Sequence, residues 1–201
     1  MTSKFQAVAT PVRLQKGATL IEALVSILIM SLGLLGMASL QLNALSFQKT
    51  SWATHRVSEL SSDIGERIKT NPEAADSGAY TLTGTYSTLK SATMTNNLCR
   101  GPAAADCTPA QIANDDIQDL LSKAQRTLPG GAISLEGSRL FGYTVTTMYQ
   151  DKDFIDISTG VAQASTACTS ATSGIAWRNC CPAAASVPAG VRCNRLPIVS
   201  F

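Results

Sequence analysis

Residues 13–40 of the chain read RLQKGATLIEALVSILIMSLGLLGMASL, and this stretch decides how the rest of the protein is organised. From Ala18 to Leu40, 23 residues, the side chains are apolar, small or hydroxyl-bearing, with Glu22 as the one charged exception. At about 1.5 Å per residue, a helix of this length crosses a bilayer. Burying a carboxylate in such a segment is costly, which makes Glu22 a candidate functional residue.

The residues ahead of the apolar segment are basic. Lys4, Arg13 and Lys16 precede Gly17, and no acid lies among them. The formal net charge of the whole chain is +2, so without the first 17 residues it is 2 − 3 = −1. A basic leader favours retention of this end on the cytoplasmic side of a membrane. Because the positive balance lies in the leader, it gives no reason to expect nucleic-acid binding.

The order of basic leader, Gly17, four residues, Glu22 and a long apolar helix resembles the class III signal of type IV pilins and pseudopilins. The resemblance implies that a prepilin peptidase cuts between Gly17 and Ala18 and that the new N-terminus is methylated. It also implies that Glu22 pairs with the terminal amine of a neighbouring subunit, the kind of cation that a buried carboxylate needs. Many members have Phe where this chain has Ala18.

An ordinary signal anchor or secretory signal is the competing interpretation of this end of the chain. Such a signal has an apolar region of about 7–15 residues, followed by a cleavage site with small residues. Here the apolar run is longer, and Gly17 precedes it. The sequence therefore favours the pilin-type signal.

The helical pattern continues beyond Leu40. Apolar residues recur at spacings of roughly three and four, the main ones being Leu42, Leu45, Trp52, Val57, Leu60, Ile64 and Ile68. Asp63 and Arg67 have the spacing of an ion pair within a helix. Asn71-Pro72 ends the pattern, because a residue before proline is disfavoured in the α conformation. We predict one long helix from about Ala18 to Thr70, with its second half packed under a globular head.

Two segments narrow the resemblance further, SLGLLGMASLQLNAL (31–45) and HRVSELSSDIGERIKTNPEAA (55–75). They resemble PilV-type minor pilins, also called type IV pilus modification proteins. The positions that carry the match are Gly33-Leu34-Leu35-Gly36, Leu40-Gln41, Asp63, Arg67, Ile68, Lys69 and Asn71-Pro72.

This narrower resemblance implies a minor pilin that primes pilus assembly in a tip complex. Its partners would be the prepilin peptidase, other minor pilins, the major pilin and a tip adhesin. The subunit would be held in the inner membrane by a single span with its head in the periplasm, and would later reach the pilus at the cell surface.

Four parts of the chain follow from this interpretation: a leader peptide (1–17), a transmembrane or filament-core helix (18–40), an amphipathic continuation (41–71) and a globular head (72–201). The expected fold class is α+β and type IV pilin-like, with the long helix packed under an antiparallel sheet and with disulfides in the head. A head of this size holds one core.

Local signals predict the elements of the head. Thr108 followed by Pro109 is a helix start, and Pro129-Gly130-Gly131 stops that helix. Residues 132–136 and 139–151 alternate in the manner of strands, the second through Phe141 and every other residue after it. Weaker strand patterns cover 153–159 and 191–201, and residues 81–89 predict a short hairpin or an irregular loop.

The six cysteines all follow the apolar segment: Cys99, Cys107, Cys168, Cys180, Cys181 and Cys193. An even number in an exported domain predicts disulfides. Zinc sites need cysteines two to four residues apart or nearby histidines, and this chain has neither. Cys99 and Cys107 form the natural local pair. Adjacent side chains point apart, so Cys180 and Cys181 each join Cys168 or Cys193, with both pairings open.

Motifs of catalysis are missing from the sequence, which predicts a protein that is not an enzyme and needs no cofactor or metal. Asp151, Asp153 and Asp156 lack the glycine and terminal glutamate of an EF-hand loop, which favours a solvated turn over calcium. Two alternatives to the pilus role stay open. One is a minor pseudopilin of a type II secretion system, whose N-terminal signal is the same, and the other is a membrane-anchored adhesion or ligand-binding domain.

Overall fold

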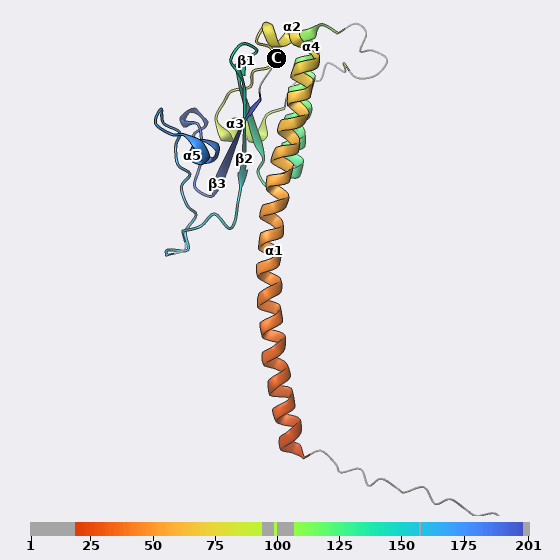
Figure 1. Ribbon diagram of the computed structural model, residues 1–201, viewed down its shortest axis with the longest axis vertical. Coiled ribbons are helices and arrows are strands. Elements are labelled where there is room, and N and C mark those ends of the chain that lie inside the picture. Colours follow the sequence, from red (N-terminus) through yellow and green to blue (C-terminus); the bar gives the residue numbers. More distant parts are fainter. Residues whose placement is uncertain (1–18, 94–98, 100–106, 157, 199–201) are drawn as a thin grey trace, which may run out of the picture. The chain divides into compact units, whose positions relative to one another are not determined.

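The computed structural model describes residues 19–93, 99, 107–156 and 158–198 of the chain. It consists of two compact units, Met1–Phe47 and Gln48–Phe201. Helix α1 (Leu20–Thr70) contributes its first part to one unit and its second part to the other (Figure 1). The predicted long helix is confirmed over this range, and Ala18 lies outside the described residues.

In the first unit, the large apolar side chains of α1 from Leu20 to Phe47 are between 51% and 86% exposed. They have no covering element in the described chain. The helix is long and apolar enough to span a membrane, with a mean hydropathy of 2.2 over its most apolar window.

The second unit is built around a three-stranded antiparallel sheet in the order β1 (Ala132–Ser138), β2 (Gly142–Gln150) and β3 (Val191–Ile198). In the register of the sheet, Leu135 lies opposite Val145, which lies opposite Leu196. Because side chains alternate between the faces of a strand, these three residues share one face. The strand prediction for 132–136 is confirmed in full, since β1 contains it. The prediction for 139–151 is confirmed for 142–150, and that for 191–201 is confirmed for 191–198, the last three residues lying outside the described chain.

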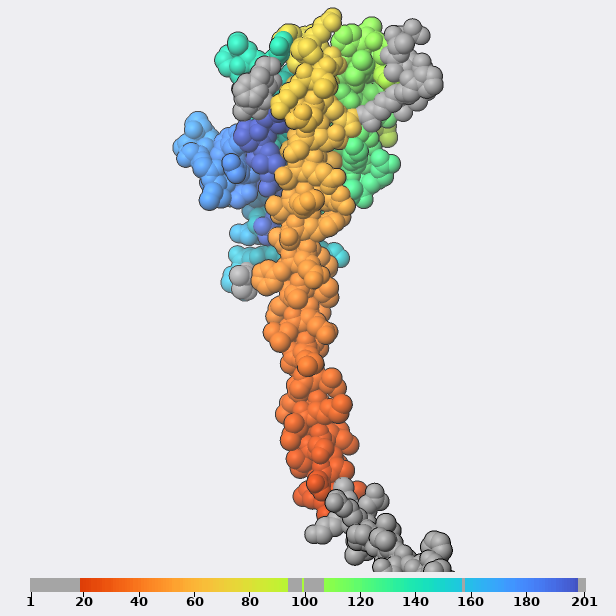
Figure 2. All heavy atoms as spheres, turned by 45° about the vertical axis from the view of Figure 1, so that its right-hand side comes forward, coloured from red at the N-terminus to blue at the C-terminus, as the bar shows by residue number. Residues whose placement is uncertain are grey.

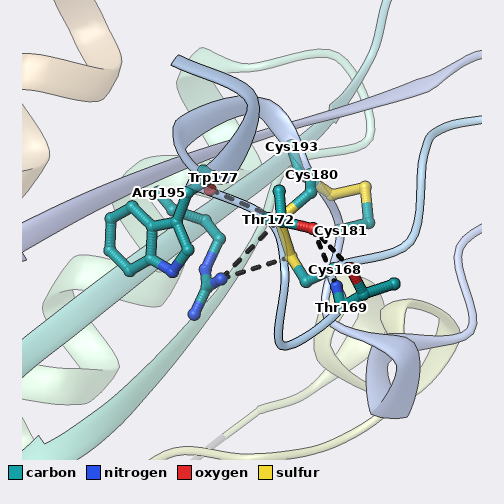
Figure 3. Close-up of a disulfide and its surroundings, with 8 residues drawn as sticks. All are labelled: Cys168, Thr169, Thr172, Trp177, Cys180, Cys181, Cys193 and Arg195. Atoms are coloured by element: carbon teal, nitrogen blue, oxygen red, sulfur yellow. Dashed lines mark hydrogen bonds between the residues drawn. A yellow bond between two sulfur atoms is a disulfide. The ribbon is translucent and has the colours of Figure 1, made fainter. Parts of the chain in front are cut away.

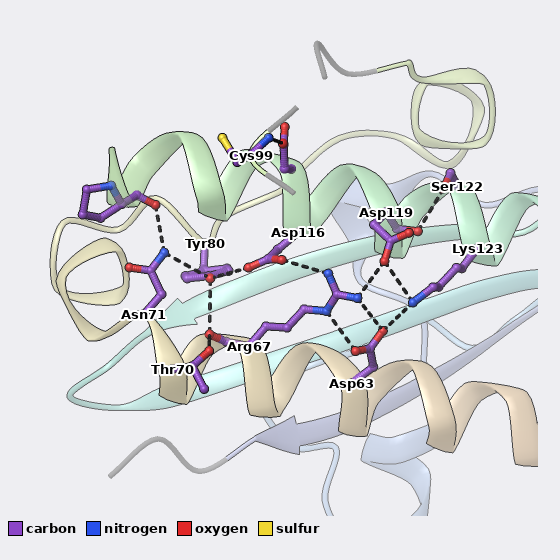
Figure 4. A network of polar contacts seen from close by, with 12 residues as sticks. Asp63, Arg67, Thr70, Asn71, Tyr80, Cys99, Asp116, Asp119, Ser122 and Lys123 are labelled. Atoms are coloured by element: carbon purple, nitrogen blue, oxygen red, sulfur yellow. Dashed lines mark hydrogen bonds and ion pairs between the residues drawn. The ribbon is translucent and has the colours of Figure 1, made fainter. Parts of the chain in front are cut away.

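One face of the sheet packs on helices α1 and α4 (Pro109–Thr127), which lie side by side (Figures 1 and 4). Its core combines residues of both helices with residues of β1 and β2, among them Val57, Ile64, Ile117, Leu120, Ile133, Leu135 and Val145. Alternating residues on the opposite face, such as Met148 and Cys193, pack on α3 (Tyr86–Ser91) and on residues near Cys181. Both faces of the sheet are therefore covered.

Helix α4 begins as its sequence predicts. The Thr108 side chain accepts a hydrogen bond from the Gln111 backbone N–H, and the Gln111 side chain accepts one from the Thr108 backbone N–H. Pro109 occupies the first turn, where a missing N–H costs nothing. This reciprocal arrangement is a capping box.

Helix α1 ends at Thr70, before Asn71-Pro72, and a short helix α2 (Pro72–Asp76) follows. In the space-filling view the second part of α1, light orange to yellow, stays visible along this face of the globular unit (Figure 2). Polar residues such as Glu59, Ser62 and Glu66 are exposed on it.

Three predictions for the head were wrong. Residues 86–89, the last part of the expected hairpin or loop, belong to α3, because Tyr86 and Leu89 are buried in the second core and Thr85 caps the helix. Phe141 does not belong to a strand; it lies in the β1–β2 turn and is 88% exposed. Residues 153–159 form no strand in their described part, where Ile155 makes an isolated bridge to Ala162.

Between β2 and β3 the chain forms an excursion, residues 151–190, that contains helix α5 (Gly174–Asn179) and a short 3₁₀ turn, η2 (Ala183–Ala185). Large apolar side chains in it, such as Val161 and Ile175, are exposed. Apart from residues such as Ala185 and Val187, which pack on the second core, few large apolar side chains hold this excursion to the sheet, and covalent links take on much of that role.

Candidate functional site

Glu22 lies in the first turn of α1, where its backbone N–H donates to the Thr19 carbonyl at 3.0 Å. Acids are favoured there by the partial positive charge of a helix N-terminus. The side chain is exposed, and no cation of the described chain pairs with its carboxylate. Gly17 and Ala18, the predicted cleavage site, lie outside the described residues.

The apolar surface of α1 that follows Glu22 offers a place for close helix packing. An added Cβ at Gly33 or at Gly36 would meet nothing within 4 Å. Small residues of this kind let another helix approach the backbone closely in a membrane or an apolar assembly. This part of α1 can therefore pack either with lipid or with the helices of other subunits.

In the globular unit, a cluster of charged side chains joins α1 to α4 (Figure 4). The Arg67 guanidinium contacts Asp63 on its own helix, at 2.9 Å from Nε to Oδ1. It also reaches Asp116 at 2.8 Å and Asp119 at 2.7 Å, both on α4. Lys123 of α4 closes the cluster with contacts to Asp63 at 2.8 Å and to Asp119 at 2.9 Å.

The cluster continues to the end of α1. The Tyr80 hydroxyl donates to Asp116 at 2.8 Å, and the Asn71 amide donates to the Pro109 carbonyl at 2.8 Å. Tyr80 is fully buried. Burial, together with its hydrogen bond to the Asp116 carboxylate, raises the pKa of Tyr80 well above its ordinary value. Tyr80 is therefore a proton donor here. Together, Tyr80 and Asn71 attach the C-terminal end of α1 to α4.

The pKa values of the three aspartates in the cluster do not all shift in the same direction. Burial alone would raise the pKa of Asp63, but hydrogen bonds from Arg67 and Lys123 lower it below its ordinary value. Asp119 likewise has a lowered pKa, because Lys123 and Arg67 outweigh its burial. Asp116 is more deeply buried, and this burial raises its pKa despite the hydrogen bonds from Tyr80 and Arg67.

The sequence predicted only one contact of this cluster, the pair Asp63–Arg67. The partners on α4 were missed because they lie about fifty residues further along the chain. A signal was present in the spacing of Asp116, Asp119 and Lys123, which lie three and four residues apart and so share one face of a helix.

The structure pairs all six cysteines in three disulfides: Cys99–Cys107, Cys168–Cys180 and Cys181–Cys193. The pairing that the sequence left open is thus resolved. Cys180 bonds back into the excursion, while Cys181 bonds to β3. The adjacent cysteines therefore fold the excursion and attach it to the sheet at one point (Figure 3).

A second contact reinforces this attachment. The Arg195 guanidinium of β3 stacks on the Trp177 ring of α5, 4.3 Å from the ring centroid. Its Nη1 also lies 3.2 Å from the Cys168 sulfur (Figure 3). Trp177 therefore packs on an arginine at the side of the sheet rather than in the apolar core.

Acidic residues of the excursion form ion pairs and hydrogen bonds with other residues of the chain. Asp151 pairs with Arg192 at 2.6 Å, and Asp156 accepts hydrogen bonds from the backbone of Ser158 and Thr159. Among residues 19–93, 99, 107–156 and 158–198, no three His, Cys, Asp or Glu side chains gather in a way that could hold a metal ion.

Comparison with known proteins finds a family match for one segment of the chain. Residues 12–38 match the family model described as the prokaryotic N-terminal methylation motif. No curated protein and no solved structure matches the chain. The matched range includes Gly17, Ala18 and Glu22. The chain thus carries a prepilin-type N-terminal segment on a pilin-like α+β fold, which supports a pilin-like or pseudopilin-like role.

Proposed function

We propose that this protein is a minor pilin of the type IV pilus, which primes pilus assembly in a tip complex with other minor pilins. One observation carries the proposal: the methylation motif lies on a helix whose apolar side chains have no partner in the described chain. Such a surface must be covered by lipid before assembly and by other helices after it.

The proposal assigns successive roles to the N-terminal residues. Residues 1–17 are a leader that the prepilin peptidase removes, and Ala18 becomes the mature N-terminus. The apolar part of α1 holds the subunit in the inner membrane, with the globular unit in the periplasm. In the assembled filament, the Glu22 carboxylate pairs with the N-terminal amine of a neighbouring subunit, because an unpaired charge among apolar helices is unfavourable.

The excursion 151–190 supports a minor rather than a major role. A major pilin must pack on identical copies of itself along the whole shaft, and a large projection on its head hinders such repeated packing. A subunit at the end of the filament has unlike neighbours, so its contacts need not repeat. Leu140 and Phe141, 84% and 88% exposed at the β1–β2 turn, offer apolar contacts to a neighbouring head.

We expect the membrane form to lack residues 1–17 and to carry one added methyl group, as measured by intact mass spectrometry. Gly17→Leu should abolish the cut, because the bulky side chain would occupy the peptidase site. Gly36→Leu is the matched control and should be cleaved normally, since Gly36 lies in open space on α1. A wild-type chain that keeps its leader in the membrane would contradict the prepilin assignment.

We expect Glu22→Gln to leave the protein in the membrane but to lower its amount in sheared pili at least about tenfold, which corresponds to about 1.4 kcal/mol. The change removes the charge and keeps the shape. Glu66→Gln is the control, because its side chain is 75% exposed on the globular unit. Quantitative proteomics of membranes and sheared pili measures both variants.

Proteomics of pili, together with a deletion of the gene, distinguishes a minor pilin from a pseudopilin of type II secretion. Equal incorporation of Glu22→Gln and wild type would remove the role of the carboxylate. If the wild-type protein were absent from pili, and its deletion stopped type II enzyme export while pili persisted, the protein would be a pseudopilin. If it were the dominant subunit of sheared pili, the minor role would be wrong.

A further inference from the structure

An arginine without a carboxylate partner lies against the disulfide Cys168–Cys180 (Figure 3). The Nη1 atom of Arg195 is 3.2 Å from the Cys168 sulfur and 3.7 Å from the Cys180 sulfur. In the part of the chain that the structure describes, no Asp or Glu forms an ion pair with this guanidinium. Burial lowers the pKa of Arg195, and the charge of Glu136 only partly opposes this shift. A partly buried cation of this kind is stabilised by a nearby anion.

Reduction of the disulfide supplies such an anion. A disulfide sulfur carries no net charge, whereas a thiolate carries a full negative charge. A cation beside a cysteine lowers the pKa of its thiol and so stabilises the thiolate. Arg195 therefore stabilises the reduced pair more than it stabilises the disulfide, which makes this disulfide a better electron acceptor.

The second sulfur also has a partner that suits its reduced form. The backbone carbonyl oxygen of Trp177 lies 3.3 Å from the Cys180 sulfur (Figure 3). A disulfide sulfur has no hydrogen to donate, but a thiol at Cys180 donates to this carbonyl. Contacts for a thiolate at Cys168 and for a thiol at Cys180 are therefore in place before the bond between them breaks.

The backbone keeps the two cysteines close together when their bond is broken. The Cys168 N–H donates to the Cys181 carbonyl at 2.9 Å, and the Cys181 N–H donates to the Thr166 carbonyl at 2.9 Å. Cys181 is in turn bonded to Cys193 of β3. Reduction of Cys168–Cys180 therefore opens one covalent loop without detaching the excursion from the sheet, and the two sulfurs remain near each other for re-oxidation.

The four cysteines of this region differ in access. Cys168 is half-buried. The other three, Cys180, Cys181 and Cys193, are at most 4% exposed. Cys168 is therefore the position at which an external thiol reaches this pair of disulfides, and Cys181–Cys193 is protected.

We propose that Cys168–Cys180 is a thiol–disulfide exchange site, which accepts two electrons from a partner protein that carries a reactive dithiol. A thiolate of the partner attacks the Cys168 sulfur, the bond to Cys180 breaks, and the Cys180 sulfur leaves as a thiolate and takes up a proton. The partner's second thiol loses its proton to water and attacks the partner's sulfur in the mixed disulfide. Cys168 then leaves as a thiolate beside Arg195, and the partner's dithiol has become a disulfide.

The test uses dithiothreitol as the dithiol probe. Full-length protein in detergent micelles is equilibrated at a series of ratios of reduced to oxidised dithiothreitol. Free thiols are trapped with iodoacetamide, and peptide mass spectrometry gives the reduced fraction of each disulfide. We expect Cys168–Cys180 to become half-reduced at a ratio at least about tenfold lower than Cys181–Cys193 requires.

Variants of Arg195 separate its charge from its packing. Arg195→Gln should shift the equilibrium toward the disulfide at least about tenfold, which is about 30 mV for a two-electron couple. Arg195→Lys keeps a cation near the sulfurs and should retain most of the wild-type equilibrium. Arg192→Gln is the matched control on the same strand, because Arg192 pairs with Asp151 and not with these sulfurs.

The ionisation of Cys168 is measured on the wild type alone. In the reduced protein, the rate at which iodoacetamide modifies Cys168 should reach half its maximum below pH 8.5, which is about the ordinary pKa of a cysteine thiol. A midpoint at or above that value would overturn the proposal, even if Arg195→Gln fails to fold.

Three results of the equilibrium measurement would also overturn it. One is reduction of Cys168–Cys180 and Cys181–Cys193 at the same ratio. Another is an equal shift in Arg195→Gln and Arg195→Lys, since the arginine would then act only by packing on Trp177. The third is an Arg195→Gln variant that behaves like Arg192→Gln, since exposure of Cys168 alone would then explain its reduction. The pilus role is unaffected by these outcomes, because incorporation into pili is measured separately.

Discussion

Replacing Arg67 with alanine is expected to lower the free energy of unfolding of the globular unit by about 2–4 kcal/mol. The Arg67 side chain is 19% exposed and contacts three carboxylates, those of Asp63, Asp116 and Asp119. Removing the guanidinium leaves these acids close together with Lys123 as the remaining cation of the described cluster. An unpaired charge in a partly buried site is much less favourable than a paired one.

Arg56→Ala is the matched control, since it removes the same side chain from the same helix. Arg56 pairs with Glu59 at 2.6 Å, but the two side chains are 38% and 54% exposed. A solvated pair of this kind contributes at most about 1 kcal/mol. Urea denaturation of the full-length protein in micelles measures both variants. Equal losses of unfolding free energy for Arg67→Ala and Arg56→Ala would show that the cluster stabilises the fold no more than a solvated ion pair does.

The pH dependence of stability is a second measurement on the Arg67→Ala variant. Asp63 and Asp119 have lowered pKa values in the folded chain, so their stabilisation is present above the ordinary value of 3.8 and is lost as the pH falls below it. The raised pKa of Asp116 acts in the opposite direction: its contribution is present below 3.8 and is lost as the pH rises.

Wild type should therefore lose the stabilisation that Asp63 and Asp119 contribute as the pH falls below 3.8. In Arg67→Ala this loss should be smaller, because the cation that acts to lower the pKa of all three aspartates is gone. An unchanged pH dependence in the variant would contradict this account of the cluster.

Removing the disulfide Cys181–Cys193 by a double change to alanine is expected to cost about 3–4 kcal/mol of unfolding free energy. The bridge closes a loop with a sequence separation of 12, for which chain entropy alone gives about 3 kcal/mol. Both cysteines are also buried, in the core that contains Met148 and Val191, so their removal costs packing as well.

The disulfide Cys168–Cys180 is a control with the same sequence separation of 12. It closes a loop within the excursion instead of joining it to the sheet, and Cys168 is only half-buried. Its removal should cost about 1 kcal/mol less, since the entropic contribution is the same and the packing loss is smaller. Thermal denaturation under non-reducing conditions compares the two double variants. A larger loss for the Cys168–Cys180 variant would contradict the assignment of Cys181–Cys193 as the main link to the sheet.

Contacts between residues near one another in the chain were predictable from the sequence. The apolar run, the stop at Asn71-Pro72 and the capping of α4 at Thr108 each depend on a few neighbouring residues. The alternation that defines β2 is equally local, although it did not show that Phe141 lies in the turn and outside the strand. The methylation motif, too, is a local pattern, and the comparison of residues 12–38 bears it out.

Tertiary structure decided the features that join distant residues. Residues 86–91 are a helix because Tyr86 and Leu89 are buried against the sheet, a tertiary contact that adds to the local cap at Thr85. Cys180 and Cys181 are adjacent in sequence, so the position of β3 relative to the excursion determines which of them bonds Cys193. The chain alone thus determined the prepilin-type segment, the long helix and most strands. The partners of Arg67 and the open pairing of the cysteines depended on packing, because electrostatic contacts and covalent bonds follow distance in space and not distance along the chain.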